Sequence, residues 1–132
     1  MTTTNITNTT PGRLFFEEHM QYLMKKDIAQ MVKNTYTEDA ILYNAFPFLD
    51  SSPPNVIQGQ EELIKVFEAY LKYQGDIQVD SLYNFLETED VISFQATITS
   101  HNTGKWAVGD IWLMQDGKIA RHFGYAHSLE NV

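Results

Sequence analysis

One carboxylate lies within the most apolar stretch of this sequence. Asp110 stands at the centre of the run Trp-Ala-Val-Gly-Asp-Ile-Trp-Leu, residues 106–113. An isolated ionised carboxylate in apolar surroundings costs several kcal/mol or more, so such a group is usually protonated, paired or exposed. A buried, paired carboxyl group is a candidate for proton transfer. Asp110 is therefore the first candidate catalytic residue, and a structural acid satisfied by a neighbour is the alternative.

A histidine on the following strand is the expected partner of Asp110. Residues 105–115 and 118–128 are predicted to form two strands joined at an Asp-Gly turn, which is a strong hairpin signal. With a three-residue loop and a left-handed glycine, Asp110 lies directly opposite His122 on the same face; with a strict two-residue turn it lies opposite Phe123. We favour the first arrangement. An adjacent Asp and His can share a proton, and the Asp then orients the imidazole and raises its basicity.

Two further polar residues are expected to complete a proton-transfer and hydrogen-bonding cluster with this pair. They are His19, on a predicted helix face, and Asn44, at the end of a predicted strand. The alternatives are a core or rim histidine for His19, a packing histidine for His122, and an amide that ties down the following loop for Asn44. The residues expected to bind the ligand are Trp106, Gln95, Thr97, Phe67 and Val108, although aromatic residues at such spacing are more often core.

Neither a metal nor a cofactor is expected. The four histidines show no HxH or HExxH spacing, and the absence of cysteine excludes thiolate ligands and disulfides. The sequence also lacks a Gly-rich phosphate loop and a Ser-His-Asp elbow. The chemistry that remains is proton transfer by carboxyl and imidazole side chains.

The first half of the chain is expected to be mostly helical. The spacing of apolar residues predicts three helices, over 13–26, over 28–36, and from Glu61 to Gly75. Asp27 is expected to be the N-cap of the second helix, with Gln30 in capping-box position. A short strand is predicted at 39–45. Residues 46–59 carry three prolines and a glycine, so we expect a functional lid or rim there and no regular element.

After Gly75 the period of the apolar residues changes to two, which predicts β-structure. Four strands are expected, at 77–87, 91–101, 105–115 and 118–128. Because their connections are short, consecutive strands must pair antiparallel. Helices followed by a run of strands are typical of an α+β fold, with the helices packed on one face of a curved antiparallel sheet.

The strand at 105–115 is apolar on both faces. One face carries Trp106, Val108, Trp112 and Met114, and the other carries Ala107, Ile111 and Leu113. A strand that is buried on both sides needs two coverings. The helices cover one face, and we predict that a second copy of the chain covers the other. The expected assembly is a homodimer through the outer sheet face.

Composition limits the classes of function. The 132 residues suffice for one domain, expected at 13–132 after a flexible Thr- and Asn-rich tail at 1–12. A net charge of −8 argues against nucleic acid and anionic membranes as partners, because both require clustered Lys and Arg. No secretory segment opens the chain, and no apolar run approaches the roughly 20 residues that span a bilayer. A cytoplasmic protein is expected.

The order of the predicted elements resembles the nuclear-transport-factor-2-like (NTF2-like) superfamily. The resemblance covers roughly residues 13–128 and includes Tyr-Thr-Glu-Asp-Ala at 36–40 and Asp-Gly-Lys-Ile at 116–119. Within the superfamily, the chain is similar to the branch of SnoaL-like polyketide cyclases, ketosteroid isomerases and limonene-epoxide hydrolases. The resemblance implies a cone, also described as a cystatin-like α+β barrel: a bent sheet wrapped around three helices, with a deep apolar pocket at its open end.

The resemblance also implies roles for single residues. The carboxylic acid that ketosteroid isomerase keeps neutral to donate a hydrogen bond falls on Asp110. The isomerase's general base falls on Asn44, which also matches the water-holding Asn of the hydrolase, and its oxyanion tyrosine falls near His19. The acid–base Asp of the cyclases and hydrolases falls on Gly124, which has no side chain. The Arg and Asp of the hydrolase strand fall among Ser93, Gln95 and Thr97.

Two functions remain after these comparisons of residues. The first is a SnoaL-like enzyme that acts by acid–base chemistry on a hydrophobic, oxygenated small molecule, with Asp110 as acid or oxyanion donor and His122 or His19 as proton shuttle. The second is a non-catalytic ligand-binding or dimeric association domain of the same fold. An enclosed cavity of several hundred Å³ where Asp110 and a histidine converge favours the first function, since that is the usual size of a ligand pocket.

Overall fold

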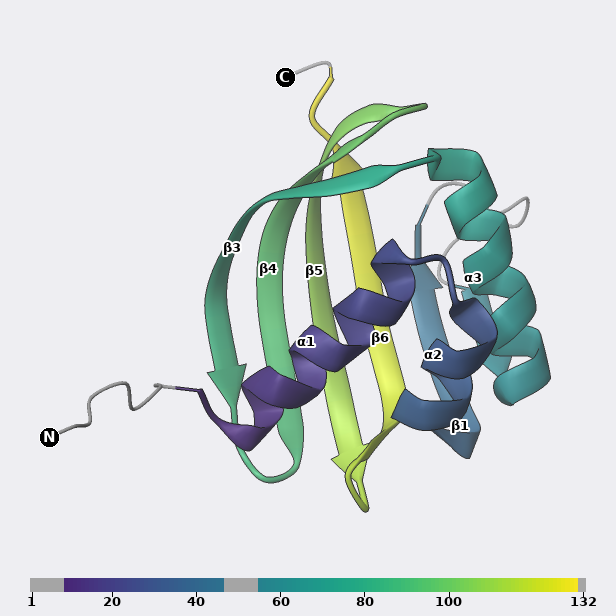
Figure 1. Cartoon of the computed structure of the whole chain (residues 1–132), viewed down its shortest axis with the longest axis vertical. Helices are drawn as coiled ribbons and strands as arrows, with labels where there is room; N and C mark the ends of the chain where they lie inside the picture. Colours follow the sequence, from purple (N-terminus) through teal and green to yellow (C-terminus); the bar gives the residue numbers. More distant parts are fainter. Residues whose placement is uncertain (1–8, 47–54, 131–132) are drawn as a thin grey trace, which may run out of the picture.

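The computed structural model describes residues 9–46 and 55–130. Within them, three helices accompany six strands (Figure 1). In chain order the elements are α1 (Pro11–Met24), α2 (Ile28–Thr35), β1 (Tyr36–Ala45), β2 (Asn55–Gln58), α3 (Gln60–Gln74), β3 (Ile77–Glu87), β4 (Val91–Ser100), β5 (Gly104–Gln115) and β6 (Lys118–Ser128).

The helices begin where their capping groups allow. Thr10 accepts a hydrogen bond from the backbone N–H of Arg13, and Pro11 is the first residue of α1. Proline is favoured there because its missing N–H would have no partner within the helix. The helix therefore begins two residues before the predicted start at 13. The predicted capping box of α2 is wrong, because the Asp27 side chain makes no capping hydrogen bond.

Two features of the strands differ from the prediction. The first strand begins at Tyr36, three residues early, because the chain passes from α2 into β1 without a loop. Residues 55–58 form β2, which pairs antiparallel with β1 through Ile41–Gln58 to Asn44–Asn55. The prediction of no regular element at 46–59 is thus wrong for these four residues. The remainder of that predicted lid, 47–54, lies outside the described residues.

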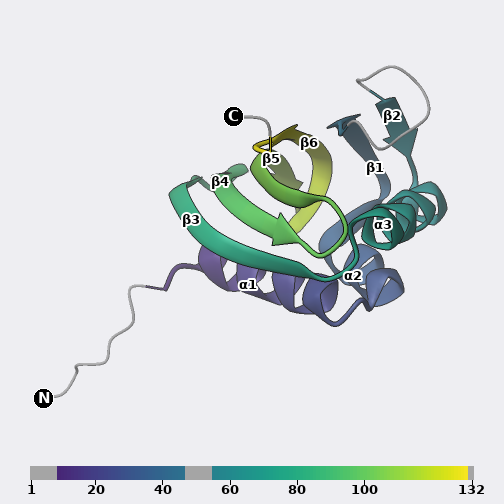
Figure 2. The ribbon, with the colours of Figure 1, turned by 90° about the horizontal axis from the view of Figure 1, so that it is seen from above.

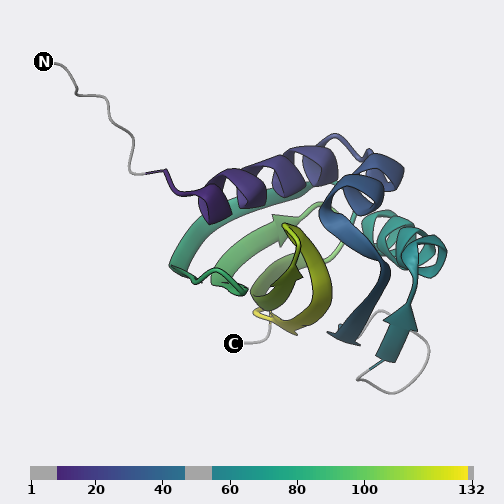
Figure 3. The same ribbon diagram turned by 90° about the horizontal axis from the view of Figure 1, so that it is seen from below.

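The six strands form one curved, open sheet in the order β2-β1-β6-β5-β4-β3. The last four strands form the predicted antiparallel meander. The prediction of a wholly antiparallel sheet is wrong for one pair, because β1 runs parallel to β6. Seen from either end, the sheet bends around the helices and does not close into a barrel (Figures 2 and 3). This is the α+β class expected, and the helices lie on the concave face.

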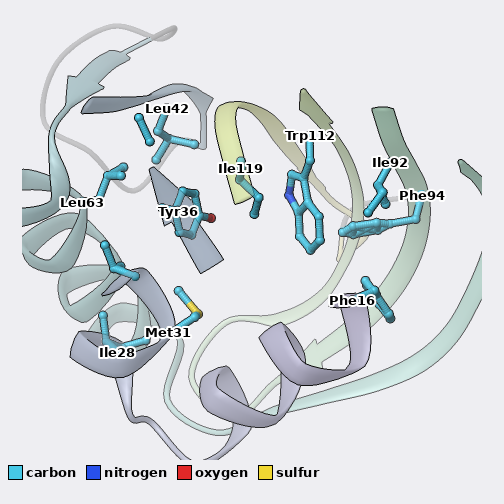
Figure 4. Packing of buried hydrophobic residues seen from close by; sticks show 12 residues of the cluster. Phe16, Ile28, Met31, Tyr36, Leu42, Leu63, Ile92, Phe94, Trp112 and Ile119 are labelled. Carbon is cyan, nitrogen blue, oxygen red and sulfur yellow. The ribbon is translucent and has the colours of Figure 1, made fainter. Parts of the chain in front are cut away.

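The core lies between the concave face of the sheet and the helices (Figure 4). Phe16 of α1 packs against Phe94 of β4 with ring centroids 4.8 Å apart, and Trp112 of β5 is 1% exposed. Tyr36 is fully buried at the start of β1. A core this rich in aromatic side chains forms the walls within which the polar groups described below are held.

Among residues 9–46 and 55–130, no helix is long and apolar enough to span a membrane.

Candidate active site

Asp110 and His122 form a hydrogen bond on the concave face of the sheet. The Nε2 atom of His122 lies 2.6 Å from Oδ1 of Asp110, and the two side chains are 8% and 14% exposed, respectively. Both side chains are therefore held away from bulk solvent. Asp110 is neither isolated nor on the outer surface.

The register that produces this contact is neither of the two predicted. The hairpin has a two-residue turn, with Gln115 paired to Lys118, and its two turn residues have positive φ, as a type I′ turn requires. A register shift next to Met114 then leaves Ala120 without a partner in β5. Asp110 consequently pairs with Gly124, and His122 pairs with Trp112. A β-bulge of this kind cannot be read from turn residues alone.

Gly124 allows the diagonal contact between Asp110 and His122. A Cβ atom at this position would lie 2.9 Å from Oδ1 of Asp110 and 3.4 Å from Nε2 of His122. The first distance is shorter than real Cβ contacts, so the pair occupies the space that a side chain would need. The position where the resemblance implies an acid–base Asp thus carries a glycine that makes room for a different acid.

Tyr36 extends the pair into a chain of three groups. Its hydroxyl lies 2.8 Å from Nδ1 of His122. Burial, and then the negative charge of Asp110, raise the pKa of Tyr36 well above its usual value, so the phenol keeps its proton. The Tyr36 O–H therefore donates to Nδ1, and Nε2–H of a neutral imidazole donates to Asp110. A doubly protonated His122 would leave the buried Tyr36 hydrogen unpaired, at a cost of about 1–3 kcal/mol.

His19 has a separate partner. Its Nδ1 lies 3.1 Å from Oγ1 of Thr35, and that hydroxyl donates to the carbonyl of Met31 at 2.5 Å. Because the hydroxyl hydrogen is used, His19 must donate from Nδ1, which leaves Nε2 as an acceptor. Burial, and then the neighbouring His122, lower the pKa of His19 to about 3. His19 is thus a neutral hydrogen-bonding group near neutral pH.

An apolar cavity of about 100 Å³ brings these groups together. Asp110, His122 and His19 all line it, together with the predicted ligand-binding residues Phe67 and Val108. Its other aromatic walls include Phe16, Tyr70, Phe94 and Trp112. The volume is smaller than the several hundred Å³ expected and suits a small ligand.

Asn44 lies on β1, which is separated from Asp110 on β5 by the strand β6. It pairs with Gly124 in parallel register, so its side chain shares the concave face with Asp110. Asn44 is 2% exposed, and its Nδ2 has no hydrogen-bond partner among the described residues. A buried amide donor without a partner is unusual in a folded protein. It does not line the cavity in this conformation.

Three predicted ligand-binding residues are not brought to the cavity. Gln95 and Thr97 alternate with the inward-facing residues of β4 and hydrogen-bond on the outer face, to Asn84 and Ser81, respectively. Trp106 is buried, but its indole N–H donates to Thr103 at the far end of β5. The side-chain period of two explains the first pair, because their neighbours Phe94, Ala96 and Ile98 face inward.

Sequence reasoning missed Tyr36 and Gly124 as parts of the site. A tyrosine at the end of a predicted helix carries no signal of its own, since the contact of Tyr36 with His122 spans 86 positions. In the sequence, Gly124 stands out only as a position where the resemblance implies an acid and none is present. One signal for Gly124 is available. The glycine lies two residues after His122, so if Gly124 is opposite Asp110 in the antiparallel pair, His122 is a diagonal neighbour of Asp110.

No group of three or more His, Cys, Asp or Glu side chains that could hold a metal ion occurs in the part of the chain that the structure describes.

Comparisons with known proteins support the fold. No protein-family model matches the sequence, and no curated protein sequence matches it. Among solved structures, an NTF2-like protein from Anabaena variabilis is similar over 97% of this chain and 96% of its own, with a TM-score of 0.74 and 22% identity. A candidate polyketide cyclase, IdmH from Streptomyces antibioticus, covers 89% and 92% with a TM-score of 0.70 and 14% identity.

A candidate isomerase from Bacillus subtilis is also similar, over 90% of this chain and 88% of its own, with a TM-score of 0.63 and 20% identity. These similarities and the observed topology establish that the chain has the NTF2-like fold. Fold alone does not determine activity, so function rests on the site.

Proposed function

We propose that this protein is a SnoaL-like small-molecule enzyme in which Asp110 acts as an acid–base group on a largely apolar substrate in the cavity. The observation that carries this proposal is the hydrogen-bonded chain from Tyr36 through His122 to Asp110 at the wall of that cavity. The similarity to candidate cyclases and isomerases is consistent with it.

The chain of hydrogen bonds gives each group a defined task. His122 holds Oδ1 of Asp110 through Nε2–H, and Tyr36 holds His122 in the tautomer that can do so. When the carboxylate takes a proton from the substrate, a substrate X–H bond breaks, a carboxyl O–H bond forms, and the electron pair stays on the substrate. His122 keeps donating throughout, so it is a positioning residue and needs no proton of its own to move.

The fixed orientation of the Asp110 carboxylate and the apolar walls around it favour proton transfer at this position. A general base is effective when it lies within hydrogen-bond reach of the proton that it takes and is fixed by a second group. The apolar walls exclude water and strengthen the electrostatic interactions of the carboxylate with a bound molecule. The substrate class that fits is a small hydrophobic molecule with a polar, proton-bearing end, such as a compact oxygenated compound.

A non-catalytic binding or association domain is the second candidate. It is favoured by the small size of the cavity and by the absence of an acidic group at Asn44 and Gly124, where the family resemblance implies acid–base residues. In that case the cavity only holds an apolar molecule, and Asp110 with His122 is a structural pair.

A two-stage experiment separates these functions. Apolar oxygenated compounds are first screened for a rise in Tm with wild-type protein and with Asp110→Asn. Each compound that binds is then incubated in D₂O, and the loss of its C–H or X–H signals is followed by NMR. We expect exchange that wild-type protein catalyses and Asp110→Asn does not. Compounds that bind both proteins equally and exchange with neither would indicate a binding domain.

A further inference from the structure

Two of the polar side chains at the cavity, Asp110 and His19, present hydrogen-bond acceptors. His122 uses both ring nitrogens inside the protein, on Tyr36 and on Asp110. His19 donates to Thr35 and keeps a bare Nε2. Asp110 supplies a carboxylate, and the other polar groups on the wall are the Tyr70 hydroxyl, which hydrogen-bonds with Gln74, and the Trp112 indole N–H, which has no hydrogen-bond partner among the described residues.

No lysine or arginine offsets the negative charge at the wall. The described residues that line the cavity include neither Lys nor Arg, and His122 already uses both ring nitrogens on Tyr36 and Asp110. Asp110 has no ion-pair partner other than His122 in the described part of the chain. A carboxylate removed from water is costly unless an opposite charge or several hydrogen bonds compensate for it.

The surroundings of Asp110 also suit a positive charge. The faces of aromatic rings attract cations by about 0.5–2 kcal/mol, and five of the aromatic rings at this cavity are Phe16, Phe67, Tyr70, Phe94 and Trp112. The net charge of −8 further favours the approach of cationic molecules. A substrate that instead developed negative charge on an oxygen would meet the Tyr70 hydroxyl and the Trp112 indole N–H, but no lysine or arginine among the described residues of the wall.

We infer that the ligand of this cavity carries a positive charge at the end that meets Asp110, as a protonated amine or iminium attached to a compact apolar body. The ammonium N–H group donates to the Asp110 carboxylate, and the apolar body lies against the aromatic walls. The inference rests on the proposed function, because it specifies which substrates the Asp110 site accepts.

Three probes with the same ring and different charge test this inference. Benzylamine, benzyl alcohol and benzoate are titrated at neutral pH into wild-type protein, Asp110→Asn and Glu89→Gln, with binding followed by calorimetry and by the shift in Tm. Glu89 is an exposed acid in the β3–β4 turn, so its substitution changes net charge equally without touching the cavity. We expect wild-type protein and Glu89→Gln to bind benzylamine at least about tenfold more tightly than benzyl alcohol, equivalent to about 1.4 kcal/mol.

Asp110→Asn is expected to bind the amine and the alcohol within about threefold of each other, about 0.7 kcal/mol, and benzoate is expected to bind none of the proteins. Equal binding of amine and alcohol by wild-type protein, or an equal loss of preference in Glu89→Gln, would overturn the cationic ligand while the acid–base site still stands. Failure of all three probes to bind wild-type protein would overturn both, because the cavity would then not accept a small apolar molecule.

Discussion

Asp110 on β5 hydrogen-bonds diagonally to His122 on the neighbouring strand β6, where Gly124, the residue directly opposite Asp110, carries only a hydrogen. Asp110 pairs with Gly124 in the ladder, yet its Oδ1 lies 2.6 Å from Nε2 of His122 two residues away. Diagonal neighbours in antiparallel strands are about 7–8 Å apart at their Cα atoms. The Asp110 and His122 side chains must therefore extend toward each other over Gly124. The Asp110–His122 hydrogen bond therefore depends on the absence of a side chain at Gly124.

Gly124→Ala should break the pair without changing either member. The added Cβ would lie 2.9 Å from Oδ1 of Asp110, so the carboxylate has to move away from His122. We expect a loss of roughly 1–3 kcal/mol in the free energy of unfolding, the usual cost of overpacking. Urea denaturation measures this loss, and the NMR signal of the His122 Nε2 proton should shift upfield as the short hydrogen bond is lost.

Two controls make the Gly124 prediction specific. Gly109→Ala changes the residue beside Asp110, but its Cβ would meet the Tyr125 ring at an ordinary 3.6 Å, so it should leave the Nε2 proton signal unchanged. In an Asp110→Ala background, Gly124→Ala should cost much less, because the clashing oxygen is gone. An equal cost with and without the Asp110 carboxylate would show that Gly124 does not act through this pair.

Tyr36→Phe should disturb the tautomer of His122. Without the phenol, Nδ1 has no donor in the buried site, and we expect a loss of about 1–3 kcal/mol in stability. The ¹⁵N chemical shifts of the ring should move from those of an Nε2–H imidazole toward a mixture of forms. Tyr83→Phe removes a hydroxyl from a 43% exposed ring and serves as the control. Unchanged ring shifts in Tyr36→Phe would contradict the assigned direction of the hydrogen bond.

His19 should make the protein less stable in mild acid. Its pKa is about 3 when folded and 6.5 in the reference state, so between these values the unfolded chain binds more protons. Stability therefore falls as pH is lowered from about 6.5 toward 3, by up to about 1.4 kcal/mol per pH unit from this group. His19→Asn keeps a donor for Thr35 and cannot titrate, so its unfolding free energy should depend less on pH over this window.

The exposed His101 provides the matched comparison. His101→Asn should retain the wild-type dependence of unfolding free energy on pH between about 6.5 and 4. If the two histidine variants show the same slopes, acid sensitivity comes from other groups and the lowered pKa of His19 is not expressed in stability.

The outer face of the sheet should mediate self-association. It exposes Leu86 and Tyr125, which are 65% and 56% exposed, beside the half-buried Ile111 and Leu113. Tyr125→Glu places a charge in this face and should shift a dimer toward monomer in sedimentation or light-scattering measurements across a range of concentrations. Leu14→Glu changes a 58% exposed residue on α1 and should leave the assembly unchanged. A wild-type protein that stays monomeric at high concentration would exclude the dimer.

The sequence by itself determined the elements and their class. Apolar periodicity placed α3 and the four C-terminal strands to within about one residue, because each period follows from local backbone geometry. It placed Asp110 and His122 on one face only under the three-residue loop, whereas in the structure a two-residue turn and the register shift next to Met114 bring them to the same face. The burial of Asp110 among apolar neighbours was likewise visible from residues 106–113.

Only the tertiary structure decided how the candidate site is connected. A bulge beside Met114 set the register between β5 and β6. The parallel pairing of β1 with β6 is one that no hairpin signal predicts. The contact of Tyr36 with His122 joined residues 86 positions apart. Gln95 and Thr97 were assigned to the site by the family resemblance, but the alternation of β4 faces them outward. Such non-local contacts depend on how whole elements pack. Periodicity therefore identifies which side chains share a face, whereas packing determines which of them touch.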